Sequence, residues 1–231
     1  MIRTNRMIRD LCRFRGIRAA LFAGLLGLAV LLAVPMPAHA QGEPEAPAAL
    51  ALGSAVPMAD VAMQNVDGKS ITLAGAAGKK GTLVLFICNH CPWVKAWQPR
   101  IAEVGNAAVK QGVGVVAINA NDPAAYAEDS FEEMVARAKQ VGYRFPYAVD
   151  ATSGIARAFG ASHTPEAFLF DAKGKLVYHG AIDDNAQHPE AVKSRWLSVA
   201  VASVAAGKRV ATAESKALGC SIKYRAVAAN P

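Results

Sequence analysis

Cys88 and Cys91, two cysteines separated by two residues, are the side chains of this sequence best suited to chemistry. They follow an apolar run, residues 83–87, and stand at the start of a segment with helix-compatible composition, residues 91–110. Where a strand ends and a helix begins, free N–H groups and the helix dipole stabilise a thiolate. We therefore expect Cys88 to be the nucleophile and Cys91, one turn later, to resolve the mixed disulfide.

Two other uses of such a pair are less favoured by the sequence. A structural zinc site needs four ligands, and the sequence has neither a second Cys-x-x-Cys motif nor a His pair to complete one. An inert disulfide across so few residues would constrain very little of the chain. Redox exchange is the remaining interpretation, and it calls for no metal and no cofactor.

Asn89 and His90, between the two cysteines, are expected to tune the redox potential. A cationic or hydrogen-bonding imidazole beside a thiolate stabilises the reduced form and makes the disulfide more oxidising. His90 therefore favours the oxidising end of the range of Cys-x-x-Cys proteins, roughly −270 to −120 mV. The alternative is a solvated His at a helix start, with no role in the chemistry.

The first 40 residues have the pattern of a secretory signal peptide. Six arginines opposed by one acid precede an apolar stretch, residues 19–34, and the segment ends in Ala38-His39-Ala40. This pattern predicts export to the periplasm or another extracytoplasmic compartment, with cleavage after Ala40 and no stable membrane insertion afterwards. The alternative is an uncleaved anchor, although the apolar stretch is shorter than the roughly 20 residues that a spanning helix needs.

Cleavage would change both the charge and the cysteine count. The 231-residue chain carries 25 basic and 18 acidic side chains, a net charge of +7. Without residues 1–40, which hold six arginines and one aspartate, 19 basic and 17 acidic side chains leave +2. The basic pI therefore gives no reason to expect nucleic-acid binding. Cys12 would leave too, and the odd number of cysteines that remains favours a redox site over a disulfide framework.

Cys220 is the third cysteine of the mature chain and follows the last expected helix. Three interpretations are open: a buried inert thiol, the partner of an intermolecular disulfide, or an extra thiol that exchanges with Cys88. A lone cysteine is most often simply buried, and the sequence favours that interpretation.

The elements that must position these residues alternate between strands and helices. A flexible lead-in is expected at residues 41–53, which are rich in Pro and Ala, and one domain at residues 54–231. The expected elements are a hairpin (61–66, 70–73), strand 83–87, helix 91–110, strand 113–119, helix 130–141, strand 147–149, helix 153–159, a second hairpin (167–170, 176–179) and a helix from Pro189 to Gly207. This order indicates an α/β fold with a mixed, mostly parallel central sheet flanked by helices.

Several stretches together resemble one family. Residues 86–95 (FICNHCPWVK) are similar to the active-site stretch of exported thioredoxin-like proteins, the redoxins of alkyl hydroperoxide reductase and thiol-specific antioxidant type. Residues 128–131 (EDSF), 168–171 (FLFD) and 219–223 (GCSIK) are similar to that group as well. The resemblance covers about residues 54–225 and places the chain in the thioredoxin superfamily.

The resemblance implies a thioredoxin-like fold with an N-terminal β-hairpin. It also implies that Thr164-Pro165 is a cis peptide and that Thr164 presents its backbone to the substrate beside the two sulfurs. Cys88 would attack and Cys91 would resolve. The implied partners are a protein or small-molecule thiol or disulfide as substrate and a second redox protein.

Some positions depart from the patterns of related groups. Thioredoxins often carry a buried acid six residues before the first cysteine, where this chain has Thr82. Glu166 is the nearest acid by sequence, and we interpret it as an ordinary strand-start carboxylate. Peroxiredoxins show Pro-x-x-x-Thr/Ser-x-x-Cys, where this chain has Gly81 and Leu85. Peroxide reduction, an antioxidant activity, is therefore an alternative without its usual motif.

His163 supports a second alternative, since similar proteins can carry Cys at this position. Next to a cis proline, His163 would lie close to Cys88, and two thiolates with an imidazole form a soft site suited to copper. The chain would then be a soft-metal carrier that uses Cys88, Cys91 and His163. Copper-delivering thioredoxin folds usually space the cysteines by three residues, and the ordinary interpretation of His163 is a loop residue.

Overall fold

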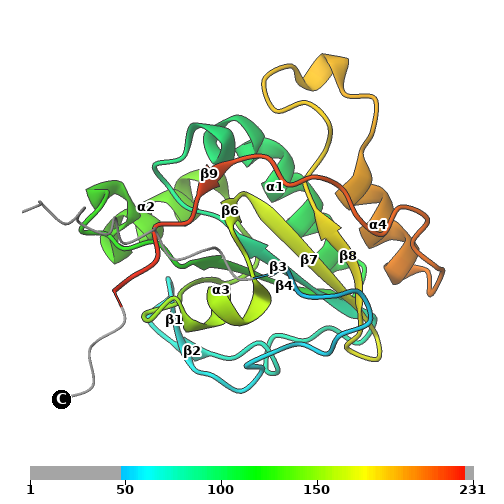
Figure 1. Ribbon diagram of the computed structural model, residues 1–231, viewed down its shortest axis with the longest axis horizontal. Coiled ribbons are helices and arrows are strands. Elements are labelled where there is room, and N and C mark those ends of the chain that lie inside the picture. The colour runs from blue at the N-terminus through cyan, green and yellow to red at the C-terminus, as the bar shows by residue number, and fades with distance from the viewer. Residues whose placement is uncertain (1–47, 227–231) are drawn as a thin grey trace, which may run out of the picture. The chain divides into compact units, whose positions relative to one another are not determined.

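A computed structural model describes residues 48–226 of the chain (Figure 1). The expected signal peptide or anchor at residues 1–40, Cys12 and most of the expected lead-in lie outside the described residues. None of the helices in the described part has the length and apolar character that a membrane span requires.

Strands and helices alternate through most of the described chain. The elements are β1 (Met63–Asn65), β2 (Ser70–Ile71), β3 (Gly81–Phe86), α1 (Pro92–Lys110), β4 (Val113–Asn119), the 3₁₀ helix η1 (Ala127–Asp129), α2 (Phe131–Val141), β5 (Tyr147–Val149), α3 (Gly154–Phe159), β6 (His163–Thr164), β7 (Glu166–Asp171), β8 (Leu176–Gly180), the 3₁₀ helix η2 (Pro189–Ala191), α4 (Trp196–Ala205) and β9 (Cys220–Ser221).

Two groups of strands lie edge to edge, in the orders β2-β1-β5-β4 and β3-β7-β8. At one end of the β3–β4 seam the Lys80 N–H donates to Gly112 O (3.1 Å), and at the other the Ile87 N–H donates to Ile118 O (3.0 Å). The first bond joins the residues just before β3 and β4, and the second joins residues at the ends of the two strands. The strands therefore run parallel, as expected of strands linked by a crossover helix.

The sheet is mixed, as predicted, but it contains fewer parallel pairs than the alternating elements suggested. β4 pairs parallel with β5, whereas β1–β2, β1–β5, β3–β7 and β7–β8 are antiparallel. Only the stretch from β3 to β5 contains the crossover helices that parallel strands require. The hairpins supply the antiparallel pairs β1–β2 and β7–β8, and the other two antiparallel pairs, β1–β5 and β3–β7, join strands that are distant in the sequence.

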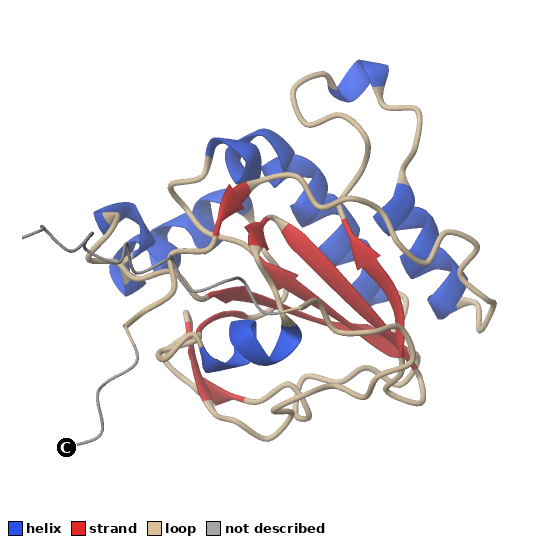
Figure 2. Ribbon diagram, in the orientation of Figure 1, coloured by secondary structure: helices blue, strands red, loops and turns tan. Residues whose placement is uncertain are grey.

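The sheet lies between helices (Figure 2). An apolar core packs on each of its faces. The side chains of β3 alternate between the cores. Leu83 and Leu85 pack with buried residues of α1, α2 and α4, and Val84 and Phe86 pack with those of α3. A strand covered on both faces is expected to be apolar throughout, as residues 83–87 are.

Helix α2 begins and ends as its sequence predicts. The side chain of Ser130 accepts a hydrogen bond from the Glu133 N–H (3.4 Å), and Gly142 ends the helix at φ +76°. A serine at the N-cap satisfies a free N–H, and glycine adopts the left-handed conformation at little cost.

The predicted continuous helix from Pro189 to Gly207 is wrong. The structure has the short η2, an extended residue at Val192 (ψ 120°), and then α4. Asp184 binds the interrupted segment: its carboxylate accepts from the Lys193 N–H (3.0 Å), and its own N–H donates to Ser194 O (3.2 Å), so the backbone there is bonded outside a helix.

The ordered domain extends further toward the N-terminus than residue 54. The Leu50 N–H donates to Phe159 O (2.9 Å), and the Gly53 N–H donates to Leu176 O (2.8 Å). Leu50 also packs against the core on the α3 side. These contacts attach residues 50–53 to α3 and β8.

Candidate active site

The cysteine pair lies just after β3, and α1 begins one residue after the predicted start of the helix at residue 91. The first residue of α1 is Pro92 and its N-cap is Cys91, so Cys88, Asn89 and His90 form a loop before the helix. Cys91, rather than Cys88, therefore occupies the helix N-terminus, where free N–H groups favour negative charge.

Thr164 contacts both sulfurs of the pair. The Cys88 Sγ lies 3.2 Å from Thr164 Oγ1, and the Cys91 Sγ lies 3.2 Å from Thr164 O, to which its thiol donates when protonated. The Thr164–Pro165 peptide is cis, as the resemblance implied. Cys88 and Cys91 are almost completely buried, with 1% and 0% of their surface exposed.

Cys220 lies against the same pair. Its sulfur is 2.8 Å from the Cys91 Sγ, and β9 pairs with β6 so that Cys220 is opposite Thr164. All three cysteines of the described chain are free thiols. The sequence favoured an inert buried thiol, with exchange toward Cys88 as an alternative. The structure shows a partly exposed thiol in contact with Cys91 instead.

Hydrogen bonds distribute charge unequally between the sulfurs. A hydrogen bond from the Cys88 thiol lowers the pKa of Cys91, whereas burial of the Cys91 sulfur raises it. The Cys220 thiol and the backbone N–H groups of Val94 and Cys220 also donate to Cys91 and lower its pKa further. The same bond to Cys91, then burial and the Asp129 carboxylate, raise the pKa of Cys88. The reduced site thus favours a thiolate at Cys91, whereas the sequence predicted one at Cys88.

The buried carboxylate of Asp129 holds the loop between the cysteines. Its Oδ1 accepts from the N–H groups of Asn89 (2.6 Å) and His90 (3.3 Å). Its Oδ2 lies 2.6 Å from His90 Nδ1 and accepts from Asn121 Nδ2 (2.8 Å). The His90 ring also stacks on Tyr126, with centroids 3.8 Å apart. His90 is therefore fixed in place, unlike a solvated side chain at a helix start.

Asp129 was not recognised as a site residue from the sequence. It lies about forty residues from the cysteines, and reaches them because η1 follows β4 at the same end of the sheet as the loop after β3. The available signal was the EDSF stretch at residues 128–131, which shares the family resemblance but does not by itself indicate a contact with His90.

Glu166 is more than an ordinary strand-start carboxylate. It is 1% exposed, and its Oε2 accepts from the N–H groups of Ser162 (2.8 Å) and His163 (2.9 Å). Its Oε1 lies 2.6 Å from His179 Nε2. Glu166 therefore holds the backbone that leads into Thr164 and contacts neither sulfur of the pair through any of these bonds.

His163 is not assembled with the cysteines as a three-ligand copper site. Its Nδ1 lies 2.7 Å from Ser162 Oγ. Between residues 48 and 226, the one set of three metal-ligand side chains with donor atoms within 4.8 Å of one another is Cys88, His90 and Asp129. The imidazole and the carboxylate of that set are hydrogen-bonded to each other.

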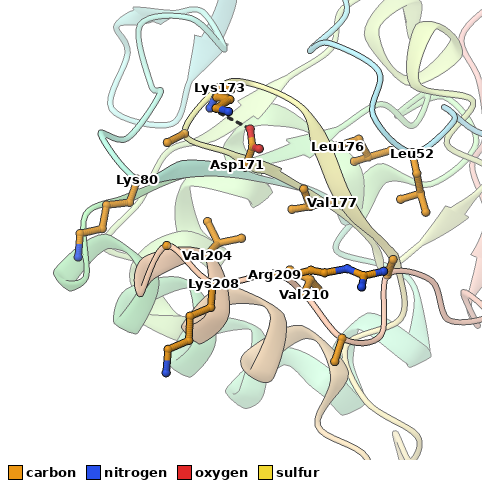
Figure 3. A pocket seen from close by; sticks show the side chains of 14 residues that line it. Leu52, Lys80, Asp171, Lys173, Leu176, Val177, Val204, Lys208, Arg209 and Val210 are labelled. Carbon is orange, nitrogen blue, oxygen red and sulfur yellow. Dashed lines mark hydrogen bonds between the residues drawn. The ribbon is translucent and has the colours of Figure 1, made fainter.

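A surface cleft of about 480 Å³ opens beside Cys220. It is lined by His90, Pro92, Tyr126, Glu128, Cys220, Ser221 and Lys223. A second cavity of about 560 Å³ lies elsewhere, where Lys80, Lys173, Lys208 and Arg209 surround an apolar floor that includes Val204 (Figure 3). No cysteine lines that cavity, whereas Cys220 lines the cleft.

Comparison with known proteins agrees with this geometry. Residues 53–179 match the AhpC/TSA family. The chain belongs to this family. It is 28% identical over 149 residues to the thiol-disulfide oxidoreductase ResA of Geobacillus thermodenitrificans, a match that covers 63% of this chain and 80% of the relative. The ResA of Halalkalibacterium halodurans is 28% identical over 115 residues, which cover 50% of this chain and 61% of that protein.

Solved structures of similar proteins support the fold of this AhpC/TSA chain. A hypothetical protein from Sinorhizobium meliloti 1021 is 37% identical with a TM-score of 0.71, over 78% of this chain and 97% of that one. An uncharacterized conserved protein from Geobacillus kaustophilus has the same identity and TM-score, over 76% and 93%. A thioredoxin-like protein in the oxidized form, 20% identical with a TM-score of 0.53, shares the fold. The predicted thioredoxin-like fold is thus confirmed.

Replacing Asp129 with asparagine is expected to slow disulfide exchange by this AhpC/TSA protein about 10- to 100-fold. An amide places N–H groups where the carboxylate now accepts, so at least one donor among Asn89, His90 and Asn121 loses its acceptor. The loop then shifts, and a displacement of about 1 Å at reacting groups can cost about 100-fold in rate. Steady-state exchange kinetics measure the effect.

Glu132→Gln is the matched control, because Glu132 is an exposed carboxylate in the first turn of α2 and does not line the cleft. It should leave the rate within about twofold, since substitutions of exposed side chains outside a site have small effects. Equal rates for Asp129→Asn and Glu132→Gln would contradict the positioning role of Asp129.

Proposed function

We propose that this AhpC/TSA-family chain is a thiol–disulfide oxidoreductase whose redox centre is the pair Cys88 and Cys91. The observation that carries the proposal is the position of both sulfurs against Thr164, at the N-terminus of α1 and beside the cis peptide to Pro165. Two thiols held against the same residue, one of them stabilised as a thiolate, are the reactants that disulfide exchange requires.

The exchange follows from these two sulfurs. The thiolate of the reduced pair attacks a substrate disulfide, a mixed disulfide forms, and the other substrate sulfur leaves as a thiolate that takes up a proton. The second cysteine of the pair then attacks the mixed disulfide, closing the Cys88–Cys91 bond and releasing the second substrate thiol. Two electrons pass from the pair to the substrate, and the reverse sequence oxidises a dithiol.

The remaining residues prepare this chemistry. Thr164 orients both sulfurs, and its backbone is paired with Cys220 of β9 and buried rather than presented to a substrate, unlike what the resemblance implied. The ring of His90 tunes the potential of the pair from a fixed position between Asp129 and Tyr126. Glu166 and Asp129 act as positioning residues.

The substrate class that this site fits is a protein or small-molecule disulfide or thiol, with a second redox protein to restore the pair. The relatives named thiol-disulfide oxidoreductase support that class. The basic and apolar pattern of residues 1–40 supports action outside the cytoplasm. The alternative of peroxide reduction has less support, because Leu85, at the position of the usual hydroxyl residue, is an aliphatic side chain fully buried in the core.

The direct test is reduction of insulin by dithiothreitol in the presence of the purified chain. The protein should accelerate precipitation of the insulin B chain, and equilibration with glutathione should show one reversible two-electron transition. No acceleration by protein with all thiols reduced would overturn the proposal. Peroxide consumption coupled to loss of Cys88 and Cys91 thiols, without insulin reduction, would favour the alternative.

A further inference from the structure

The tail that carries Cys220 forms β9, which lies beside β6 (Figure 1). Cys220 is paired with Thr164, and the Ile222 N–H donates to Ser162 O (3.0 Å) beside it. Ile222 is 6% exposed and packs into the core on the α3 side. A Cβ on Gly219 would collide with the carbonyl oxygen of Thr164, so this close approach depends on glycine.

A second anchor connects the tail to the loop that carries His90. The Lys223 N–H donates to Asn121 Oδ1 (2.8 Å), and the Asp122 N–H donates to Lys223 O (2.7 Å). The Nδ2 group of the same Asn121 donates to Asp129. The position of the Cys220 sulfur is thus set by contacts on both sides of it in the sequence.

The three sulfurs differ in their access to solvent. Cys88 and Cys91 are 1% and 0% exposed, whereas Cys220 is partly exposed and lines the cleft with His90 and Tyr126. With β9 in place, a molecule in the cleft meets Cys220 first. Behind Cys220 lies the Cys91 sulfur, at 2.8 Å.

From this arrangement we infer that Cys220 is a third redox thiol of the site, which exchanges with Cys91. In the oxidised protein the Cys220 sulfur attacks the Cys91 sulfur of the Cys88–Cys91 disulfide. The Cys91–Cys220 bond forms, the Cys88–Cys91 bond breaks, and Cys88 leaves as a thiolate that takes up the proton lost by Cys220. The step is an internal isomerisation, so it consumes no oxidant or reductant. The inference rests on the proposed function of the pair and deepens it.

The exchange moves the disulfide from a buried position to the cleft. A substrate thiolate in the cleft can attack the Cys220 sulfur, with Cys91 as the leaving group. Departure is favoured because the Cys91 thiolate is stabilised at the N-cap of α1 and by its hydrogen bonds. A second substrate thiol then releases Cys220, which completes a two-electron oxidation of the substrate.

Disulfide mapping tests the inference directly. The reduced full chain is treated with one equivalent of the thiol oxidant diamide, blocked with N-ethylmaleimide and digested with trypsin. Cleavage after Lys80, Lys95, Lys216 and Lys223 puts Cys88 and Cys91 on peptide 81–95 and Cys220 on peptide 217–223. We expect a cross-link of these two peptides with Cys88 blocked, and the same cross-link as the main product in Cys88→Ser. Full blocking of Cys220 in both proteins would overturn the inference.

The matched control moves the thiol by one residue, as Cys220→Ser combined with Ser221→Cys. Consecutive strand residues point to opposite faces, so this thiol faces away from Cys91 and should give no cross-link. If this variant gave as much cross-link as the wild type, the cross-link would not depend on the position of the thiol, and the inference would be overturned.

A rate measurement completes the test. Oxidised Cys220→Ser should react with glutathione about tenfold more slowly than the oxidised wild type, because both remaining sulfurs are buried and exchange depends on access. Equal rates would overturn the role of Cys220 as the accessible sulfur. Insulin reduction by the same preparations separates the two proposals. An active wild type without the cross-link would refute only the role of Cys220, and a cross-linked but inactive wild type would refute the function of the pair.

Discussion

Replacing Cys91 with serine is expected to reduce insulin-disulfide exchange to the uncatalysed rate. This variant removes the sulfur that the Cys88–Cys91 and Cys91–Cys220 disulfides share, so neither can form and the cycle cannot close. Cys88→Ser keeps Cys91 and Cys220 and should retain part of the rate, whereas Cys88→Ser combined with Cys220→Ser should lose all of it. Initial rates of insulin reduction measure the loss. Cys12→Ser serves as a control, because that cysteine precedes the predicted cleavage site and lies outside the motif.

The two serine variants should differ in their thiolate titration. In Cys88→Ser the introduced hydroxyl can still donate to the Cys91 sulfur, and the donors from Cys220 and the backbone remain. The pKa of Cys91 should therefore stay lowered, and the ultraviolet absorbance of its thiolate should persist as the pH falls below the ordinary thiol value of about 8.5. In Cys91→Ser the contribution of Cys91 is lost, but burial and the Asp129 carboxylate still raise the pKa of Cys88, so this thiol should stay protonated above that value. The opposite pattern would place the charge on Cys88, as the sequence alone suggested.

Replacing Asp183 with alanine is expected to destabilise the protein by about 3–5 kcal/mol, the usual cost of removing one partner of a buried ion pair. Asp183 is 3% exposed and forms that pair with Arg100. It also accepts from Trp97 Nε1 (2.7 Å). Both partners lie on α1, so the loss would also loosen the helix whose N-cap is Cys91. Equilibrium denaturation by urea measures the change.

Asp184→Ala provides the comparison for this stability measurement. Asp184 is the exposed neighbour and accepts only the Lys193 N–H (3.0 Å), so its removal should cost about 1 kcal/mol or less. A similar midpoint for the two variants would contradict the importance of the buried pair. Trp97 of α1 is fully buried, packs in the core and donates its Nε1–H to Asp183, so it has a structural role.

Local sequence patterns predicted much of the fold, because they reflect short-range physics. The apolar run at residues 83–87 indicated a strand covered on both faces, and Ser130 with Gly142 indicated the ends of α2. The last helix was predicted too long, because part of its predicted backbone is bonded instead to Asp184, a residue outside the helical pattern. The balance of parallel and antiparallel strands was also missed, since strand direction depends on chain reversals that no local pattern encodes.

The sequence by itself determined that Cys88 and Cys91 lie between a buried strand and a helix N-terminus, and it predicted that they act as a redox pair, since their spacing and flanking elements are local properties. Which sulfur favours the charge depends on the tertiary structure, because Asp129 and Cys220 act on the two sulfurs from distant parts of the chain and Cys91 is the N-cap of α1. The contact of Cys220 with Cys91 joins residues 129 positions apart and arises from the pairing of β9 with β6. Contacts at such separation follow from the fold, and they extend the pair to a site with three sulfurs.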